Sequence, residues 1–147
     1  FANDLQRKFG GQGGDFAMAY VLAHEVGHHV QNQSGLLMHV HKLQQQMSEA
    51  DAKKYSVALE LHADYLAGVF AYYVQQKGYL DAGDIEEAIN AAKTVGDDHL
   101  QKITQGQIRP EEFTHGTSAQ RAEWFRRGMQ YHDFGHGDTF GALGLQI

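Results

Sequence analysis

The sequence predicts a mostly α-helical fold, on three observations. Apolar residues recur at spacings of three and four in several long segments, and glycine-rich stretches separate these segments. No segment shows the alternating or β-branched pattern that is typical of a strand. The chain has 147 residues, of which 42% are hydrophobic and 20% charged, and that length can bury a core. We therefore expect one domain over residues 1–147.

The first predicted helix runs from Phe16 to about Gln33. It follows a glycine-rich turn and a candidate N-cap at Asp15, and Gly35 lies just beyond its end. Five apolar residues recur at helical spacing within it: Ala19, Leu22, Ala23, Val26 and Val30. We expect this stripe to be the buried face of the helix.

Two further helices are predicted in the middle of the chain. Residues 48–76 carry apolar positions at helical spacing, and Gly78 is a suitable stop. The next helix is expected to start at Asp84, because Asp84 and Glu87 have the spacing of a capping box, and to end near Gly96.

The last predicted helix opens at Thr117. Gln120 follows three residues later, which is again capping-box spacing, and the apolar pattern continues to Tyr131. The residues after Tyr131 are rich in glycine, so we expect a loop there.

Composition limits the classes of partner and metal ligand. The net charge of −6 and the isoelectric point near 5.9 argue against nucleic acid as a partner, because proteins that bind it usually carry a clustered Lys/Arg surplus. No apolar run approaches the roughly 20 residues of a membrane span, so no membrane contact is expected from this chain. Because the chain has no cysteine, any metal must be held by histidines and carboxylates.

The stretch "AHEVGHH", residues 23–29, contains a candidate metal site. His24 and His28 are four residues apart, so both imidazoles project from one side of a helix and can share an ion. Glu25 lies about 100° further round, where its carboxylate can hold a water molecule beside the metal. This is the His-Glu-x-x-His pattern of zinc peptidases. The alternative is a polar patch on an ordinary amphipathic helix.

A catalytic zinc site normally has three protein ligands. The metzincin pattern requires glycine at position 31 and histidine at position 34, whereas this chain has Gln31 and Ser34, so that class is excluded. The other common arrangement takes a glutamate from a later helix. Glu60, in the stretch "ELHAD", is the candidate third ligand.

Asp64 follows Glu60 by one helical turn and is expected on the same side of the helix. It can accept a hydrogen bond from the free ring nitrogen of His24 or His28 and so orient the imidazole. His62 is about 200° away from Glu60 and is expected to face away from the metal. The alternative for Glu60 and Asp64 is a solvated helix face.

The chain resembles the neutral zinc metallopeptidase family of bacterial proteins. Four stretches carry the resemblance: "FGGQGGDFAMAYVLAHEVGHHVQ", "ELHADYLAGVF", "AAKTVGDDHLQ" and "THGTSAQRAEWFRRG". The resemblance implies a zinc cofactor, Glu60 as the third ligand and Glu25 as the catalytic carboxylate.

The same resemblance implies more sequence before Phe1. Relatives often have an N-terminal membrane anchor, and the β-strands of a zincin would lie in that preceding part. We therefore expect residues 1–147 to be the helical portion of a zincin-like metallopeptidase domain that is truncated at its N-terminus. The full-length protein would then be membrane-anchored, periplasmic or otherwise extracytoplasmic.

His115 and Arg121 lie in the stretch "THGTSAQR". Their spacing is similar to the His-to-Arg spacing of CAAX-prenyl-protease-type zinc peptidases. We expect His115 to donate to an oxyanion and Arg121 to anchor its loop to a carboxylate; alternatively, His115 only caps the following helix. Asp97 and Asp98 are either partners of the site or an ordinary helix C-terminal turn.

The remaining candidate histidines are not expected in the site. His29 is one residue off the metal face, and the spacing of His39 and His41 suits a strand but not a helix. The expected function is hydrolysis of peptide bonds in a peptide or protein substrate by zinc-activated water, with Glu25 as general base. The alternative is a non-catalytic metal-binding or interaction module, or an inactive fragment of a larger membrane-anchored protein.

Overall fold

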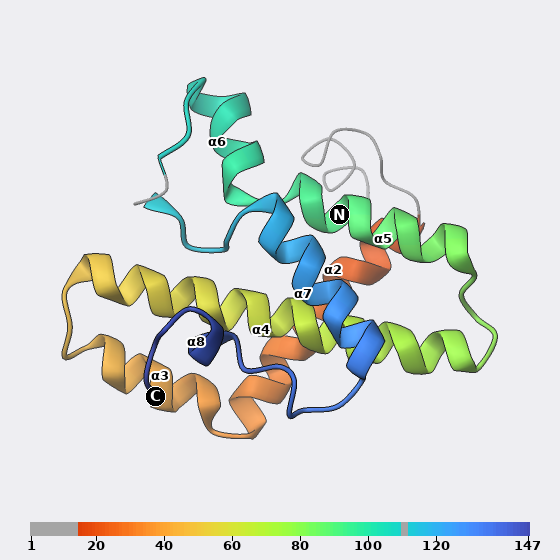
Figure 1. Ribbon diagram of the computed structural model, residues 1–147, viewed down its shortest axis with the longest axis horizontal. Coiled ribbons are helices and arrows are strands. Elements are labelled where there is room, and N and C mark those ends of the chain that lie inside the picture. The colour runs from red at the N-terminus through yellow and green to blue at the C-terminus, as the bar shows by residue number, and fades with distance from the viewer. Residues whose placement is uncertain (1–14, 110–111) are drawn as a thin grey trace.

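A computed structural model describes residues 15–109 and 112–147 (Figure 1). Within these ranges the regular elements are α-helices and no strand is present, which confirms the mostly α prediction. The glycine-rich turn predicted before Asp15, and any preceding sheet, lie outside the described residues. In chain order the helices are α2 (Asp15–Gln33), α3 (Leu36–Gln44), α4 (Glu49–Gln76), α5 (Ala82–Thr94), α6 (Asp97–Gln105), α7 (Ser118–Tyr131) and α8 (Thr139–Ala142).

Side-chain caps set the starts of several helices. Thr117 and Gln120 form the predicted capping box at the start of α7. The predicted start of α5 is wrong: Asp81 is the N-cap and Asp84 is its capping-box partner, so the box lies three residues earlier than expected. Asp81 takes this role because its carboxylate accepts the backbone N–H of Asp84 at 3.0 Å while Asp84 accepts that of Asp81.

Helices α3, α6 and α8 are not among the predicted elements. His39 and His41, whose spacing suits a strand, lie in α3. Gly35 ends the turn after α2 in a left-handed conformation, with φ of 84°, and α3 begins at the next residue. Tertiary packing then holds the helix, because its buried Val40 belongs to an apolar cluster with residues of α4 and α8. Residues after Tyr131 are not wholly loop, since they include the short α8.

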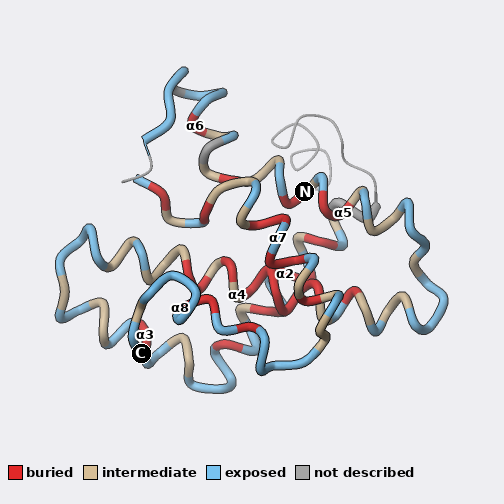
Figure 2. The backbone as a smooth tube through the Cα atoms, in the orientation of Figure 1, coloured by how far each residue is buried: buried red, intermediate tan, exposed pale blue. Residues whose placement is uncertain are grey.

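The main core lies where α2 and α7 cross the long central helix α4. Buried positions concentrate at these crossings (Figure 2). Tyr20 of α2 and Phe125 of α7 pack edge to face, with ring centroids 5.8 Å apart. Ala67 of α4 and Ile89 of α5 belong to the same buried cluster. Four helices therefore meet around one point, and the candidate site is beside it.

The predicted buried stripe of α2 is wrong at four of its five positions, and only Ala23 is buried as expected. Leu22, Val26 and Val30 are 54%, 49% and 37% exposed, respectively. The helix instead turns its polar face, with His24 and Gln31, toward α4. This orientation is tolerable because both side chains find hydrogen-bond partners there.

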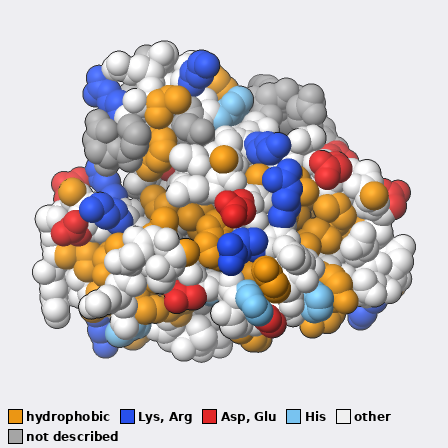
Figure 3. Space-filling view, viewed as in Figure 1, with side chains coloured by type: hydrophobic (Ala, Val, Ile, Leu, Met, Phe, Trp, Pro, Cys, Tyr) orange, Lys and Arg blue, Asp and Glu red, His pale blue; other side chains and the backbone are white. Residues whose placement is uncertain are grey.

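The surface mixes charge and apolar areas. On the face shown in Figure 3, acidic and basic side chains are interspersed and hydrophobic side chains occupy several separate areas. Across the described ranges, no helix combines the length and the apolar character that crossing a membrane requires.

Helices α4 and α7 approach closely at Gly68, and this contact yields a first prediction. A Cβ atom at position 68 would overlap the Phe125 carbonyl oxygen, which is backbone and cannot rotate away. Gly68→Ala is expected to lower the free energy of unfolding by about 1–3 kcal/mol. Urea titration followed by circular dichroism measures this. Gly135→Ala, at a position with open space, is the matched control and should change stability little; equal stability of the two variants would contradict the prediction.

Candidate metal centre

His24, His28 and Glu60 come together in the structure. His24 Nε2 lies 3.4 Å from Glu60 Oε1, and His28 Nε2 lies 2.7 Å from Glu60 Oε2. One potential ligand atom from each residue falls within 4.8 Å of the other two, which makes the group a possible metal site. The spacing of four on α2 supplies the two imidazoles and α4 supplies the carboxylate.

A glycine allows α2 to approach α4 at this point. A Cβ atom at Gly27 would lie 2.9 Å from the Ala63 carbonyl oxygen, which is closer than side chains tolerate. Gly27 lies between the two histidines in sequence, and Ala63 lies between Glu60 and Asp64. The absence of a side chain at position 27 therefore brings the imidazoles within reach of Glu60.

Asp64 is fully buried and organises the inner side of the site. Its Oδ1 accepts hydrogen bonds from His24 Nδ1 at 2.8 Å and from the Tyr20 hydroxyl at 2.5 Å. Arg121 Nε donates to its Oδ2 at 2.8 Å, and Arg121 Nη1 donates to the Val95 carbonyl at 3.1 Å. The expected hydrogen bond between Asp64 and a site histidine is thus present. Tyr20 could not be singled out from the sequence, because any of several tyrosines could have reached the site.

The second histidine has a different partner, Gln31. His28 Nδ1 lies 2.9 Å from Gln31 Oε1, while Gln31 Nε2 donates to the Leu59 carbonyl at 2.8 Å and lies 2.9 Å from His62 Nδ1. From the sequence alone, the only significance of Gln31 is that it stands where the metzincin pattern requires glycine. His62 is not grouped with the candidate ligands, as expected, but it contacts the site through Gln31 rather than standing apart from it.

The mutual contacts shift the pKa values of the three candidate ligands. Burial lowers the pKa of His24, but hydrogen bonds to Asp64 and Glu60 outweigh it and raise that pKa to about 9. Burial opposes the change at His28 as well, and the Glu60 carboxylate raises its pKa. Burial raises the pKa of Glu60, whereas the two imidazoles lower it below its usual range. These shifts favour positively charged imidazoles and a negatively charged Glu60 carboxylate where the three side chains meet.

The donor set fits a zinc ion. The Nδ1 atoms of His24 and His28 are taken up by Asp64 and Gln31, so both Nε2 atoms remain to face Glu60. Two imidazole nitrogens and one carboxylate oxygen are a common ligand set for catalytic zinc. The outer partners of the imidazoles add no unpaired charge, because Arg121 pairs with Asp64 and the amide of Gln31 is neutral.

Glu25 is exposed and does not join the three candidate ligands. It lines a cavity of about 300 Å³ together with Tyr20, His24, Glu60, His115 and Arg121. Glu25 therefore lies on the open side of the site, where water has access.

Asp97 holds the loop that carries His115. Its Oδ2 accepts the backbone N–H groups of Thr114, His115 and Gly116 at 2.9, 2.6 and 2.9 Å. Burial raises the pKa of Asp97, but its hydrogen bonds with His115 outweigh this and lower the pKa. In the resulting position His115 Nε2 lies 3.4 Å from Glu60 Oε1. His115 is therefore at the site, on its half-exposed side.

Arg121 binds a carboxylate, as expected; it is Asp64, whereas the loop that carries His115 is held by Asp97. Of the two alternatives for Asp97, the helix C-terminal turn is excluded because this residue begins α6. Its hydrogen bonds to the loop favour the other alternative, a partner of the site. The side chain of Asp98 lies outside the described residues.

Three further histidines are not part of the candidate metal site. His29, His39 and His41 are exposed and belong to none of the candidate metal-binding groups found among the described residues.

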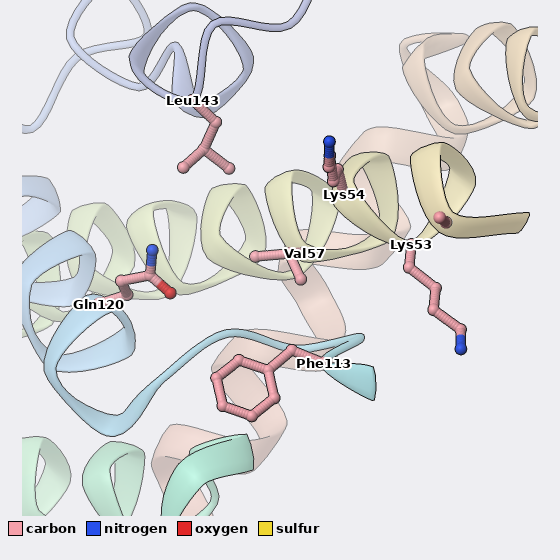
Figure 4. Close-up of a pocket in the computed structure, with 7 residues that line it drawn as sticks. Lys53, Lys54, Val57, Phe113, Gln120 and Leu143 are labelled. Atoms are coloured by element: carbon pink, nitrogen blue, oxygen red, sulfur yellow. The ribbon is translucent and has the colours of Figure 1, made fainter. Parts of the chain in front are cut away.

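A second cavity, of about 340 Å³, does not have the features of a metal or catalytic site. Figure 4 shows that Lys53 and Lys54 leave α4 in different directions, so their ammonium groups do not converge. They approach Glu49 and Asp51 on the same helix instead, at 3.7 and 3.6 Å. The residues labelled in Figure 4 are Lys53, Lys54, Val57, Phe113, Gln120 and Leu143.

Comparisons with known proteins agree with the geometry. Residues 1–140 match the model of the family described as "Putative neutral zinc metallopeptidase". The chain is 50% identical over 141 residues to "Uncharacterized protein YpfJ" of Escherichia coli (strain K12), covering 96% of this chain and 49% of that protein. It is 44% identical over 155 residues to "Uncharacterized protein Rv2575" of Mycobacterium tuberculosis (strain ATCC 25618 / H37Rv), covering 99% of this chain and 51% of that protein. The chain thus spans about half the length of these relatives.

No solved structure shows significant similarity to the chain. The family description itself implies zinc, and the group of His24, His28 and Glu60 is where this chain could hold it. With the family match extending over nearly the whole sequence, the chain belongs to the neutral zinc metallopeptidase family.

Proposed function

We propose that this chain carries the catalytic centre of a zinc-dependent metalloendopeptidase. The observation that carries the proposal is the convergence of His24, His28 and Glu60, with Glu25 on the open side of the same cavity. The arrangement is that of a zincin in which glutamate is the third ligand. The substrate class, a peptide or unstructured protein, follows from membership of the family rather than from the ligand set, which amidases and phosphoesterases can share.

Each residue of the proposed site has a separate role in the reaction. His24, His28 and Glu60 would hold the zinc ion, which when bound lowers the pKa of a water molecule toward about 7 and polarises a carbonyl group. Glu25 accepts a proton from the attacking water and passes it to the leaving amine. His115, held over Glu60 by the Asp97 loop, donates a hydrogen bond to the oxyanion that develops on the substrate.

Asp64 and Arg121 support this chemistry without touching substrate. Asp64 keeps the Nδ1 proton on His24, so that Nε2 faces Glu60. Arg121 neutralises Asp64 and ties α7 to α4. For the whole protein we propose a peptide or protein substrate, no nucleic-acid partner, and a membrane anchor outside this chain.

Zinc content and proteolysis test the proposal together. The chain is expected to bind one zinc ion per molecule, measured by metal analysis after dialysis, and to cleave casein in a reaction that a chelator stops and zinc restores. Glu60→Gln is expected to weaken zinc binding by at least about 100-fold, because a neutral amide replaces the anionic member of the ligand set. Glu112→Gln, an exposed carboxylate on the surface, is the matched control and should bind zinc as the native chain does.

The outcomes separate the two candidate functions. Absence of zinc binding by the native chain would overturn the metal site itself. Tight zinc binding with no cleavage of casein would overturn the peptidase assignment of this chain and leave the alternative, a non-catalytic metal-binding module or an inactive fragment of a larger protein.

A further inference from the structure

Gln31 is buried at 0% exposure, yet it is polar and lies outside the proposed ligand set. It follows His28 by three residues on α2, so its side chain reaches back to the outer nitrogen of that imidazole. A buried amide must have its hydrogen bonds satisfied, and Gln31 satisfies them with groups from both α2 and α4.

The Leu59 carbonyl decides which way the Gln31 amide points. A carbonyl oxygen can only accept, so the atom 2.8 Å from it must be the amide nitrogen. The amide oxygen then faces His28 Nδ1 at 2.9 Å, and because that oxygen can only accept, His28 must donate from Nδ1. In the neutral imidazole, the form that binds a metal, the lone pair of His28 consequently lies on Nε2, the atom that faces Glu60.

His62 is the third hydrogen-bond partner of the Gln31 amide. Gln31 Nε2 has two protons: one goes to Leu59 and the other points to His62 Nδ1, 2.9 Å away. His62 must therefore accept at Nδ1. An amide flip would place the Gln31 oxygen against the Leu59 carbonyl, where neither atom has a proton. The carbonyl therefore selects the orientation, and His62 supports it by accepting the second amide proton.

The two histidines are thus oriented by different chemistry. His24 donates to Asp64, a carboxylate paired with Arg121, whereas His28 donates to a neutral amide. A carboxylate at position 31 would place an oxygen against the Leu59 carbonyl, which offers no proton. The neutral amide is therefore the group that this position requires.

We propose that Gln31 is the positioning residue of His28, held in one orientation by the Leu59 carbonyl and His62, and that it fixes Nε2 of His28 as the zinc-binding atom. The inference rests on the proposed function in one respect only, namely that the site binds zinc.

Zinc affinity of a shape-conserving variant is the main test. Gln31→Met removes both hydrogen-bonding groups and is expected to weaken zinc binding about 10- to 100-fold, measured by competition with a chromophoric chelator. Gln44→Met is the matched control. Gln44 also ties a neighbouring helix to α4, donating to the Ala52 carbonyl at 2.8 Å and to Ser56 Oγ at 3.0 Å, but it is not among the residues of the candidate metal site. Its loss should leave zinc affinity unchanged.

Two substitutions at His62 test the orientation of the amide. His62→Asn offers a side-chain oxygen that can accept from Gln31, and it is expected to keep zinc affinity within about threefold of the native chain. His62→Leu offers no acceptor and is expected to fall toward the affinity of Gln31→Met. Equal affinities for the two His62 variants would contradict the role of His62.

A spectroscopic measurement on the native chain needs no variant to fold. In the zinc-loaded protein, nitrogen-15 spectra of the His28 ring should show a protonated Nδ1 and a metal-bound Nε2. A metal-bound Nδ1 would overturn the inference. So would a Gln31→Met protein that binds zinc as tightly as Gln44→Met. Failure of the native chain to bind zinc at all would instead overturn the proposed function, so the two failures are distinguishable.

Discussion

A Glu25→Gln protein is expected to bind zinc as tightly as the native chain and to cleave casein about 10²- to 10⁴-fold more slowly. Glutamine has nearly the same shape as glutamate but cannot accept a proton from water. Because Glu25 is exposed on the open side of the cavity and is not one of the three ligands, its substitution should leave the metal site intact.

The measurement pairs metal content with single-substrate kinetics. Zinc is quantified first, so that a loss of rate cannot come from a loss of metal, and kcat and KM are then measured on a fluorogenic peptide that the native chain cleaves. The loss is expected in kcat. Glu86→Gln, an exposed glutamate on α5, is the matched control and should retain full activity. Unchanged kcat in Glu25→Gln would assign the general base to another residue.

The two pairs of residues at the candidate metal site were predictable because helical geometry is local. Two histidines four residues apart must share a face, and Glu60 with Asp64 repeats that spacing on α4. What the sequence could not supply was the rotation of α2 about its own axis. The apolar pattern pointed to Leu22 and Val26, yet these are exposed and the histidine face packs inward.

The reason lies in hydrogen bonds that only the tertiary structure reveals. Gln31 and Asp64 give hydrogen bonds to the buried polar atoms of the histidine face, and these bonds compensate for the desolvation of that face against α4. Neither contact has a local signal, because Asp64 is 40 residues from His24 and Leu59 is 28 residues from Gln31. The same holds for Asp97, which binds backbone groups of a loop 17 to 19 residues away.

Helix α3 was not predicted from the sequence, for a related reason. Its polar residues weaken the apolar periodicity, and a helix of nine residues is marginal in isolation. Val40 becomes buried only when α4 and α8 are in place, so the segment is stabilised by long-range packing rather than by its own pattern.

Removal of the Asp64 carboxylate is expected to be the most damaging single change to stability. Asp64→Ala leaves the Arg121 guanidinium, itself only 4% exposed, without its anionic partner. Loss of one member of a buried pair is expected to lower the free energy of unfolding by about 3–5 kcal/mol. The Tyr20 hydroxyl and His24 Nδ1 lose their acceptor as well. Urea titration of zinc-free protein measures the effect, so that changes in metal binding do not contribute.

A double variant separates the buried charge from packing. Asp64→Leu combined with Arg121→Met removes both charges and keeps apolar volume, and it is expected to be more stable than Asp64→Ala, because an uncharged pair leaves no guanidinium unpaired. Glu123→Ala, which removes an exposed carboxylate from α7, is the control and should change stability by less than about 1 kcal/mol. If Asp64→Ala were no less stable than Glu123→Ala, the network around Asp64 could not be what holds α2, α4 and α7 together at the site.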